Sequence, residues 1–243
     1  MKILIINPNT TASMTAKIDL AARKTASADT AITTVNPFFG PPSIEGYYDQ
    51  AFAVPGLIDQ IHHNGGHADA VIIGCFDDTG LDAARCVSVG PVIGIGEAAF
   101  HMASLVSGRF SVVTTLRQSV PAIEQNLVRY GLSSRCSSVR ACDVPVLELE
   151  RPGSAAQERV ADQISRALSE DNAEAIVLGC AGMAELAQAM SQRFRAPVLE
   201  GVSCAVQLCE GLIRLGLSTT SLGGYQRPRP KSFSGIFSSF SPA

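Results

Sequence analysis

The 243-residue sequence predicts an α/β protein made of two similar halves, each built on a parallel sheet. Short, continuous apolar runs alternate with longer segments of helical pattern, which is the order of βαβ units whose strands are buried on both faces. In addition, VIIGCFDDTGL and IVLGCAGMAEL share one pattern of branched apolar residues, then Gly-Cys, then a turn into a helix. This echo indicates an internal duplication.

The apolar runs predict the strands and the segments between them predict the helices. The expected strands are Lys2–Ile6, Ala31–Val35, Ala70–Gly74, Pro91–Ile95, Arg109–Thr114, Val139–Val144, Ala175–Gly179 and Pro197–Leu199. The expected helices are Ser13–Thr25, Val54–His63, Leu81–Val87, Val120–Tyr130, Ala155–Ser169, Met183–Arg193 and Cys204–Leu215. Successive strand, helix and strand segments join through right-handed crossovers, so each helix covers a face of a sheet.

We expect the two pseudo-symmetric halves to form two domains, 1–97 with 206–243 and 98–205. Ligands of open α/β sheets bind outside the carboxyl ends of the strands. Two halves that face each other would therefore bring both Gly-Cys turns to one active-site cleft between them. After residue 218 the chain is rich in Gly, Ser and Pro but keeps Tyr225 and three phenylalanines, which predicts an arm that packs on its own domain or on a neighbouring subunit.

The composition narrows the class of protein. Hydrophobic residues make up 46% and charged residues 17%, and the apolar runs are too short for a membrane span or a signal peptide. A net charge of −3 with scattered basic residues predicts no nucleic-acid or membrane partner. Seven cysteines without a close CxxC pair or a secretion signal are typical of free thiols in a reducing compartment. We expect a cytoplasmic protein with no bound metal.

Cys75 and Cys180 are the strongest candidates for chemistry, because each stands at the end of a strand, after a glycine and before a predicted helix. A helix N-terminus favours the thiolate over the thiol, and its N–H groups can hold a developing oxyanion. The other five cysteines lack the Gly-Cys turn. Cys86, Cys204 and Cys209 fall in helical segments, and Cys136 and Cys142 are expected away from the active end of a strand.

Two thiols in matched positions suit the inversion of a stereocentre without a cofactor. One group must remove a proton from one face of a carbon next to a carbonyl, and the other must return a proton to the opposite face. Acid–base catalysis of this kind works best with groups that titrate near the working pH, and a cysteine can be tuned to that range.

Five motifs together resemble the hydantoin and allantoin racemases of the aspartate/glutamate racemase superfamily. They are NPNT (Asn7–Thr10), PSIEG (Pro42–Gly46), GCFDDTGLDAAR (Gly74–Arg85), VVTTL (Val112–Leu116) and VLGCAGM (Val177–Met183). The resemblance runs in order from residue 2 to about residue 240. It implies a pseudo-symmetric two-domain fold, Cys75 and Cys180 as opposed acid and base, and no metal, pyridoxal phosphate or flavin.

The resemblance also implies the residues that bind the substrate. Asn7 and Thr10 would contact the ligand, and Ile44 would cover its ring. Phe76, Thr114 and Thr115 would line the pocket, and the backbone N–H groups of Phe76, Ala181 and Gly182 would hold the ring carbonyls. This sequence departs from the family pattern at Gly74 and Thr79, where relatives often carry Ala and Pro, and these changes bear on ring specificity.

Other polar residues have structural interpretations. Asp77 and Asp78 are expected to be helix caps or dipole partners, although either could touch substrate, and Glu45 is expected to orient its loop. The HHNGGH segment with His62, His63 and His67 is expected to be a solvated loop rather than a metal site.

For the substrate, the phenylalanine beside Cys75 favours a flat, neutral cyclic ureide over a dicarboxylate. Racemisation of 5-substituted hydantoins is the leading expectation and racemisation of allantoin the alternative. More distant alternatives are an aspartate/glutamate-type racemase and a non-catalytic ligand-binding or redox-sensing protein. The expected partners are a small-molecule ureide and further copies of the chain in a homo-oligomer.

Overall fold

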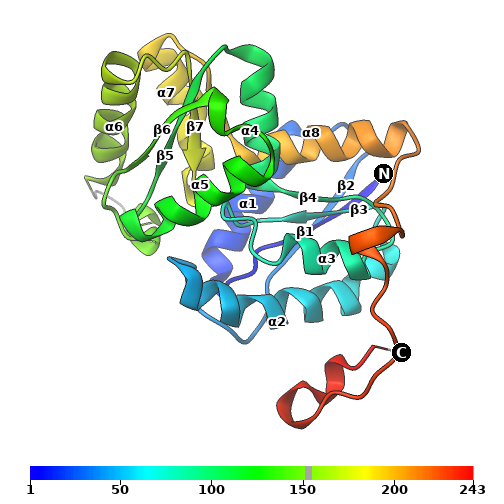
Figure 1. Ribbon diagram of the computed structural model, residues 1–243. Coiled ribbons are helices and arrows are strands. Elements are labelled where there is room, and N and C mark those ends of the chain that lie inside the picture. Colours follow the sequence, from blue (N-terminus) through cyan, green and yellow to red (C-terminus); the bar gives the residue numbers. More distant parts are fainter. Residues whose placement is uncertain (151–154, 243) are drawn as a thin grey trace.

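The computed structural model describes residues 1–150 and 155–242 and contains two parallel four-stranded sheets (Figure 1). The first has the order β2-β1-β3-β4 and the second the order β6-β5-β7-β8. The strands are β1 (Lys2–Ile6), β2 (Ala31–Val35), β3 (Ala70–Ile73), β4 (Val92–Gly94), β5 (Phe110–Thr114), β6 (Cys136–Ala141), β7 (Ala175–Gly179) and β8 (Val198–Glu200). The order is the same in both halves, as expected from a duplicated unit.

Helices cover both faces of each sheet. They are α1 (Ala12–Thr25), α2 (Tyr47–Asn64), α3 (Leu81–Val87), α4 (Ile95–Val106), α5 (Val120–Arg129), α6 (Ala156–Glu170), α7 (Ala187–Phe194) and α8 (Gly201–Arg214). In the first sheet, Leu4 and Ile6 of β1 pack toward α2 and α3, whereas Ile3 and Ile5 pack toward α1 and α8. Burial on both faces explains why these strands read as continuous apolar runs.

The second sheet is covered in the same way. Phe110 and Val112 of β5 belong to the same hydrophobic cluster as α4 and α5, and Val113 belongs to a cluster with α6 and α7. The predicted α/β fold with two parallel sheets is thus confirmed.

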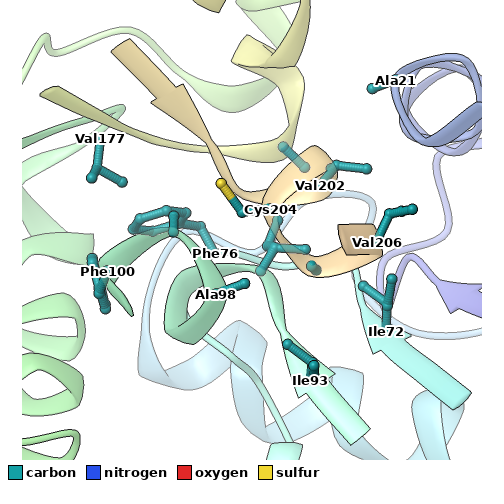
Figure 2. Close-up of a cluster of buried hydrophobic side chains, with 14 of the residues drawn as sticks. Ala21, Ile72, Phe76, Ile93, Ala98, Phe100, Val177, Val202, Cys204 and Val206 are labelled. Carbon is teal, nitrogen blue, oxygen red and sulfur yellow. The ribbon is translucent and has the colours of Figure 1, made fainter. Parts of the chain in front are cut away.

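Helices α4 and α8 join the two halves. Helix α4 follows β4 of the first sheet but packs on β7 and β8 of the second, and α8 follows β8 but packs on β3 and β4. The two helices also pack on each other. Figure 2 shows part of this shared core, in which Ile72 and Ile93 come from the first sheet, Val177 from the second, and Phe100 and Cys204 from these helices. The division into domains 1–97 with 206–243 and 98–205 stays a prediction; it assigns most of each exchanged helix to the sheet that it covers.

Helix α4 was not expected from the sequence. Its N-cap is Gly94, which has no side chain to cap the first turn. The carboxylate of Asp78 instead accepts hydrogen bonds from the backbone N–H groups of Gly96 and Glu97, at 2.9 and 2.8 Å. Gly94 leaves the room, since a Cβ there would lie 2.0 Å from Asp78 Oδ1. The start of α4 is therefore fixed by a residue from another turn, which local sequence cannot signal.

Other boundaries also differ from the expected ones, and three of them change the interpretation of a segment. Helix α2 begins at Tyr47, seven residues before the predicted start, and carries Pro55 in its interior. Strand β6 is shifted by three residues toward the N-terminus because the CSSVRA segment is a half-buried edge strand without an apolar run. A six-residue 3₁₀ turn, Ala181–Leu186, precedes α7, so the regular helix begins at Ala187.

The C-terminal arm packs on its own half through Tyr225. The Tyr225 hydroxyl accepts a hydrogen bond from Arg85 at 3.3 Å and donates one to Asp82 at 3.2 Å, and the Arg85 guanidinium lies 5.5 Å from the ring centre. Beyond Tyr225 the arm is mostly exposed and ends in a 3₁₀ turn, Gly235–Phe240 (Figure 1). This turn lies beside α2, where the Phe240 ring centre is 6.5 Å from that of His62. Over the described residues, no helix combines the length and hydropathy needed to cross a bilayer.

The crossing of α4 and α8 predicts a large effect for one glycine. A Cβ on Gly201 would lie 2.3 Å from the backbone oxygen of Ile95, so Gly201→Ala should lower the free energy of unfolding by about 1–3 kcal/mol. Gly211→Ala on the same helix is the control. Its Cβ would meet nothing within 4 Å, and its better helix propensity should leave stability unchanged or raise it by up to about 1 kcal/mol. Urea unfolding of both variants measures the difference, and equal stabilities would refute the close crossing.

Candidate active site

Cys75 and Cys180 occupy equivalent positions in the two halves. Cys75 comes two residues after β3, and Cys180 comes directly after β7. Both strands stand third in their sheet order, and each pairs with the first strand of its half, β1 or β5. The parallel registers place both cysteines at the carboxyl ends of the strands, where ligands of such sheets bind.

Both cysteines line one cavity with an empty volume of about 390 Å³, part of it open to solvent. The first half contributes Asn9, Met14, Ile44, Gly74, Cys75, Phe76 and Asp77, and the second contributes Thr115, Ser119, Val146, Gly179, Cys180 and Ala181. The cavity is therefore built by both halves.

The glycine before each cysteine has the same packing role. A Cβ on Gly74 would lie 3.1 Å from the backbone oxygen of Ile6, and one on Gly179 would lie 2.8 Å from the side chain of Thr114. Ile6 and Thr114 are the last residues of β1 and β5. The Gly-Cys pattern thus lets each cysteine turn pass close to the neighbouring strand.

Each sulfur has local hydrogen-bond donors. The Cys75 sulfur lies 3.5 Å from the Thr79 hydroxyl and accepts from the backbone N–H of Asp77. The Cys180 sulfur accepts from the backbone N–H of Gly182. Thr79 is one of the departures from the family pattern, and its hydroxyl gives Cys75 a contact that a proline could not make.

The expectation that helix N-termini lower the thiol pKa values is wrong for this structure. Burial raises the pKa of Cys75 well above its usual range and that of Cys180 to about 12, and the nearby charge of Asp77 adds to both shifts. The donated N–H groups oppose these shifts but do not overcome them. For Cys75 the first regular helix, α3, also begins six residues later, at Leu81. Loss of hydration therefore outweighs the hydrogen bonds donated to the sulfurs.

Asp77 and Asp78 are neighbours with different surroundings. Asp78 is buried, and its carboxylate accepts hydrogen bonds from the backbone N–H groups of Gly96 and Glu97 and from the Tyr130 hydroxyl. Asp78 is therefore a helix cap, as expected, but it caps α4 and not α3, the helix that follows it in the chain. Asp77 lines the cavity, and its Oδ2 accepts a hydrogen bond from Gln50 at 2.9 Å. Burial raises the pKa of Asp77 to about 6 and that of Asp78 to about 7.

Comparison with known proteins agrees with this arrangement. The Asp/Glu/Hydantoin racemase family model matches residues 3–209. The chain is 45% identical over 236 residues to a hydantoin racemase of Rhizobium meliloti, covering 97% of this chain and 98% of that protein. It is 42% identical over 241 residues to a hydantoin racemase of Pseudomonas sp. (strain NS671), covering 99% and 97%. An allantoin racemase structure from Klebsiella pneumoniae covers 100% of both chains with a TM-score of 0.96 at 45% identity.

The chain belongs to the Asp/Glu/hydantoin racemase family. This family assignment rests on nearly the whole length of the chain and agrees with the two-sheet architecture and with the paired cysteine turns.

Of the residues that the family resemblance implies, four besides the cysteines line the cavity: Ile44, Phe76, Thr115 and Ala181. Ile44 lies on a loop that Glu45 holds against the second half, since Glu45 Oε1 accepts from the backbone N–H of Val146 at 3.0 Å. This contact fits the expected orienting role of Glu45. Phe76 also packs in the core, edge-to-face on Phe100 (Figure 2).

Four other expected site residues do not line the cavity. Asn7 is fully buried, and its amide donates to Asn9 Oδ1 at 2.9 Å and to Thr15 Oγ1 at 3.0 Å. Thr10 bonds the carbonyl of Pro41. Thr114 donates to the carbonyl of Gly179 at 3.0 Å, and Gly182 directs its N–H to the Cys180 sulfur. Their contact with substrate stays a prediction, and their observed partners are structural.

Sequence reasoning missed several lining residues: Asn9, Met14, Ser119 and Val146. Asn9 stands inside the NPNT motif, so the motif signalled the region but not which asparagine faces the cavity. Met14 comes from the first turn of α1, and Ser119 and Val146 come from segments after β5 and β6. Met14, Ser119 and Val146 belong to none of the five motifs, and only the fold brings them to the cavity.

The remaining cysteines and histidines occupy structural positions, with two corrections to the expected ones. Cys86, Cys204 and Cys209 lie in helices and Cys136 begins β6, as expected. Cys142, however, follows the carboxyl end of β6 directly, because this strand begins three residues earlier than expected. His62 and His63 are exposed but belong to α2 rather than to a loop. In residues 1–150 and 155–242, no three His, Cys, Asp or Glu side chains are grouped to hold a metal ion.

The shared influence of Asp77 on both thiols predicts how they respond to Asp77→Asn. Asp77 ionises above about pH 6, so at pH 8 its charge is present and raises both thiol pKa values. Removal of the charge lowers these values and increases the thiolate fraction, so iodoacetamide at pH 8 should alkylate Cys75 and Cys180 severalfold faster.

Cys136 provides the control within the same protein. Burial, Glu124 and Asp171 raise its pKa, and Asp77 is not among the main causes. Its alkylation rate, followed by mass spectrometry of the same digest, should be equal in both proteins. Unchanged rates at Cys75 and Cys180 would show that the Asp77 charge does not reach the sulfurs.

Proposed function

We propose that this protein is a cofactor-independent racemase of 5-substituted hydantoins, with allantoin as the alternative substrate, and that Cys75 and Cys180 are its acid and base. The observation that supports this proposal above all is one cavity lined by both cysteine turns, of which each follows a strand of a different four-stranded sheet. Relatives named for hydantoin racemisation and a matching allantoin racemase structure give the substrate class.

The reaction inverts the ring carbon next to a carbonyl. One cysteine acts as thiolate and removes the proton, so the C–H bond breaks and an S–H bond forms while the electron pair moves to the carbonyl oxygen. The opposite cysteine, as thiol, then gives its proton to the other face, and its S–H bond becomes a new C–H bond. Each turnover exchanges the protonation states of the two cysteines, and the reverse reaction follows the same path.

The partial burial of the two sulfurs affects this chemistry in two ways. Raised thiol pKa values make the thiolate scarce but strongly basic, as is useful against a weak carbon acid. The N–H groups given to the sulfurs by Asp77 and Gly182 stabilise whichever thiolate is present. Phe76 and Ala181, which directly follow the two cysteines and line the cavity, are proposed to hold the ring carbonyls through their backbone N–H groups.

An aspartate/glutamate-type substrate is less well supported. An acidic amino acid brings negative charge and calls for a cation, yet no Lys or Arg of the described residues lines the cavity. Arg85, the basic residue of the first cysteine motif, pairs with Glu97 at 2.6 Å. The apolar contacts of Ile44, Val146 and Phe76 suit a flat neutral ring instead.

We also propose that the enzyme is cytoplasmic and homo-oligomeric and that residues 1–97 with 206–243 and 98–205 form its two domains. All seven cysteines are free, in keeping with a reducing compartment. Exposed apolar side chains on the arm and near α2, among them Phe38, Tyr48 and Ile236, favour association with further copies.

Single cysteine variants test the division of labour between the thiols. Cys75→Ser and Cys180→Ser should each abolish racemisation, because a full turnover needs both groups. In deuterium oxide each variant should still exchange the ring proton of one enantiomer without inversion, and the two variants should prefer opposite enantiomers. Optical rotation and proton NMR measure both processes with a chiral 5-substituted hydantoin, and the wild type should be assayed with allantoin and aspartate as well.

Cys86→Ser is the matched control, since Cys86 lies on α3 outside the cavity, and it should racemise like the wild type. If either active-site variant racemises at a near-normal rate, that cysteine does not act as acid or base. If both variants exchange the same enantiomer, the thiols do not face opposite sides of the ring.

The loop residue Ile44 is expected to set the preferred ring substituent. Ile44→Ala removes a buried apolar contact from the cavity wall, so the preference among 5-substituents, measured as ratios of kcat/KM, should shift by about 1–3 kcal/mol toward larger groups. Phe76→Ala is a poorer test because Phe76 also packs on Phe100 in the core. Unchanged ratios in Ile44→Ala would mean that the loop does not contact the substituent.

A further inference from the structure

Asp77 is held in the cavity by both halves of the protein. Its Oδ2 accepts a hydrogen bond from Gln50 on α2 at 2.9 Å, and its backbone oxygen accepts one from Asn126 on α5 at 2.8 Å. Helices α2 and α5 belong to different lobes (Figure 1). The position of this carboxylate is therefore fixed relative to both Cys75 and Cys180, whose cavity it shares.

Asp77 is also the one charged residue among the described residues that line the cavity. Its charge acts on both thiols and makes both harder to ionise. A half-buried anion without a cationic partner costs free energy, and it works against the thiolate that the proposed reaction needs. Charged groups kept in such unfavourable surroundings are typical of functional sites, where they bind ligand or take part in catalysis.

One oxygen of Asp77 is available for that use. Within the described residues, Oδ2 accepts from Gln50 and Oδ1 makes no hydrogen bond. A carboxylate can accept several hydrogen bonds, and the ring of a cyclic ureide carries N–H donors next to its carbonyls. The carboxylate that caps α4 belongs to the adjacent Asp78, so the Asp77 carboxylate is not needed as a helix cap.

We propose that Asp77 is the specificity-determining residue of this site: its carboxylate accepts a ring N–H of a neutral ureide and repels anionic ligands. This inference rests on the proposed function, since it assigns the ring-recognition group of the same cavity. It makes Asp77 part of the reason why the site selects a neutral ring over an acidic amino acid.

The hydrogen bond is tested with N-methylated substrates. Wild-type enzyme is assayed for kcat/KM with a 5-substituted hydantoin and with its N1-methyl and N3-methyl derivatives. Methylation of the nitrogen that faces Asp77 should lower kcat/KM by about 10- to 100-fold, the usual size for loss of a hydrogen bond to a charged acceptor. In Asp77→Ala, which has no acceptor, this ratio should fall toward one.

The charge is tested with two substrates of nearly equal shape, 5-carboxymethylhydantoin and 5-carbamoylmethylhydantoin. Wild-type enzyme should prefer the neutral amide by roughly tenfold or more, because like charges repel strongly in a site of low dielectric constant. Asp77→Asn removes the charge but keeps an acceptor oxygen. It should lose most of this preference while it retains part of the N-methyl discrimination.

Asp78→Asn is the matched control. It changes the neighbouring carboxylate, which caps α4 and does not line the cavity, so it should lower stability but keep both discrimination ratios. Wild-type ratios near one, or Asp77 variants that fold and keep wild-type ratios, would overturn the role of Asp77. Wild-type enzyme that racemises none of these hydantoins and no allantoin would instead overturn the proposed function.

Discussion

The reciprocal packing of α4 and α8 is the constraint on which the rest of the structure depends. Each helix leaves the last strand of one sheet and covers the other sheet, and the two cross so closely that Gly201 has no room for a side chain. The shared core around Phe100 and Cys204 therefore couples the halves. Close-packed interiors transmit small displacements, so the relative position of the two cysteine turns depends on this core.

A second consequence concerns the turn after Cys75. Asp78 caps α4, and Gly96 has no space for a Cβ because the backbone oxygen of Phe76 would lie 2.3 Å away. Hydrogen bonds and close packing between them thus fix the first turn of α4 and the turn after Cys75 relative to each other. In the second half, Glu200 caps α8 from its own strand end, through Val202 and Ser203. Equivalent helices are capped by carboxylates from different sequence positions, which shows how the two halves have diverged.

The electrostatics of the cavity follow from burial. Both thiols line a cavity that is only partly open to solvent, beside an anion and without a lining cation among the described residues. This environment keeps the thiols protonated and makes any thiolate that forms strongly basic. The backbone N–H groups of Asp77 and Gly182 partly stabilise that thiolate by hydrogen bonds. The same anion discriminates against acidic ligands.

The sequence by itself determined the α/β class, the strands other than β6, and the repeated pattern that contains Cys75 and Cys180. These features depend on local hydrophobic periodicity and on a pattern repeated within the chain. Five motifs also located Ile44, Phe76, Thr115 and Ala181. Only the tertiary structure decided the start of α4, the lining positions of Asn9, Ser119 and Val146, and the different duties of Asp77 and Asp78. It also reversed the expected thiol pKa shift, since a sequence shows a neighbouring helix but not how much water the fold removes.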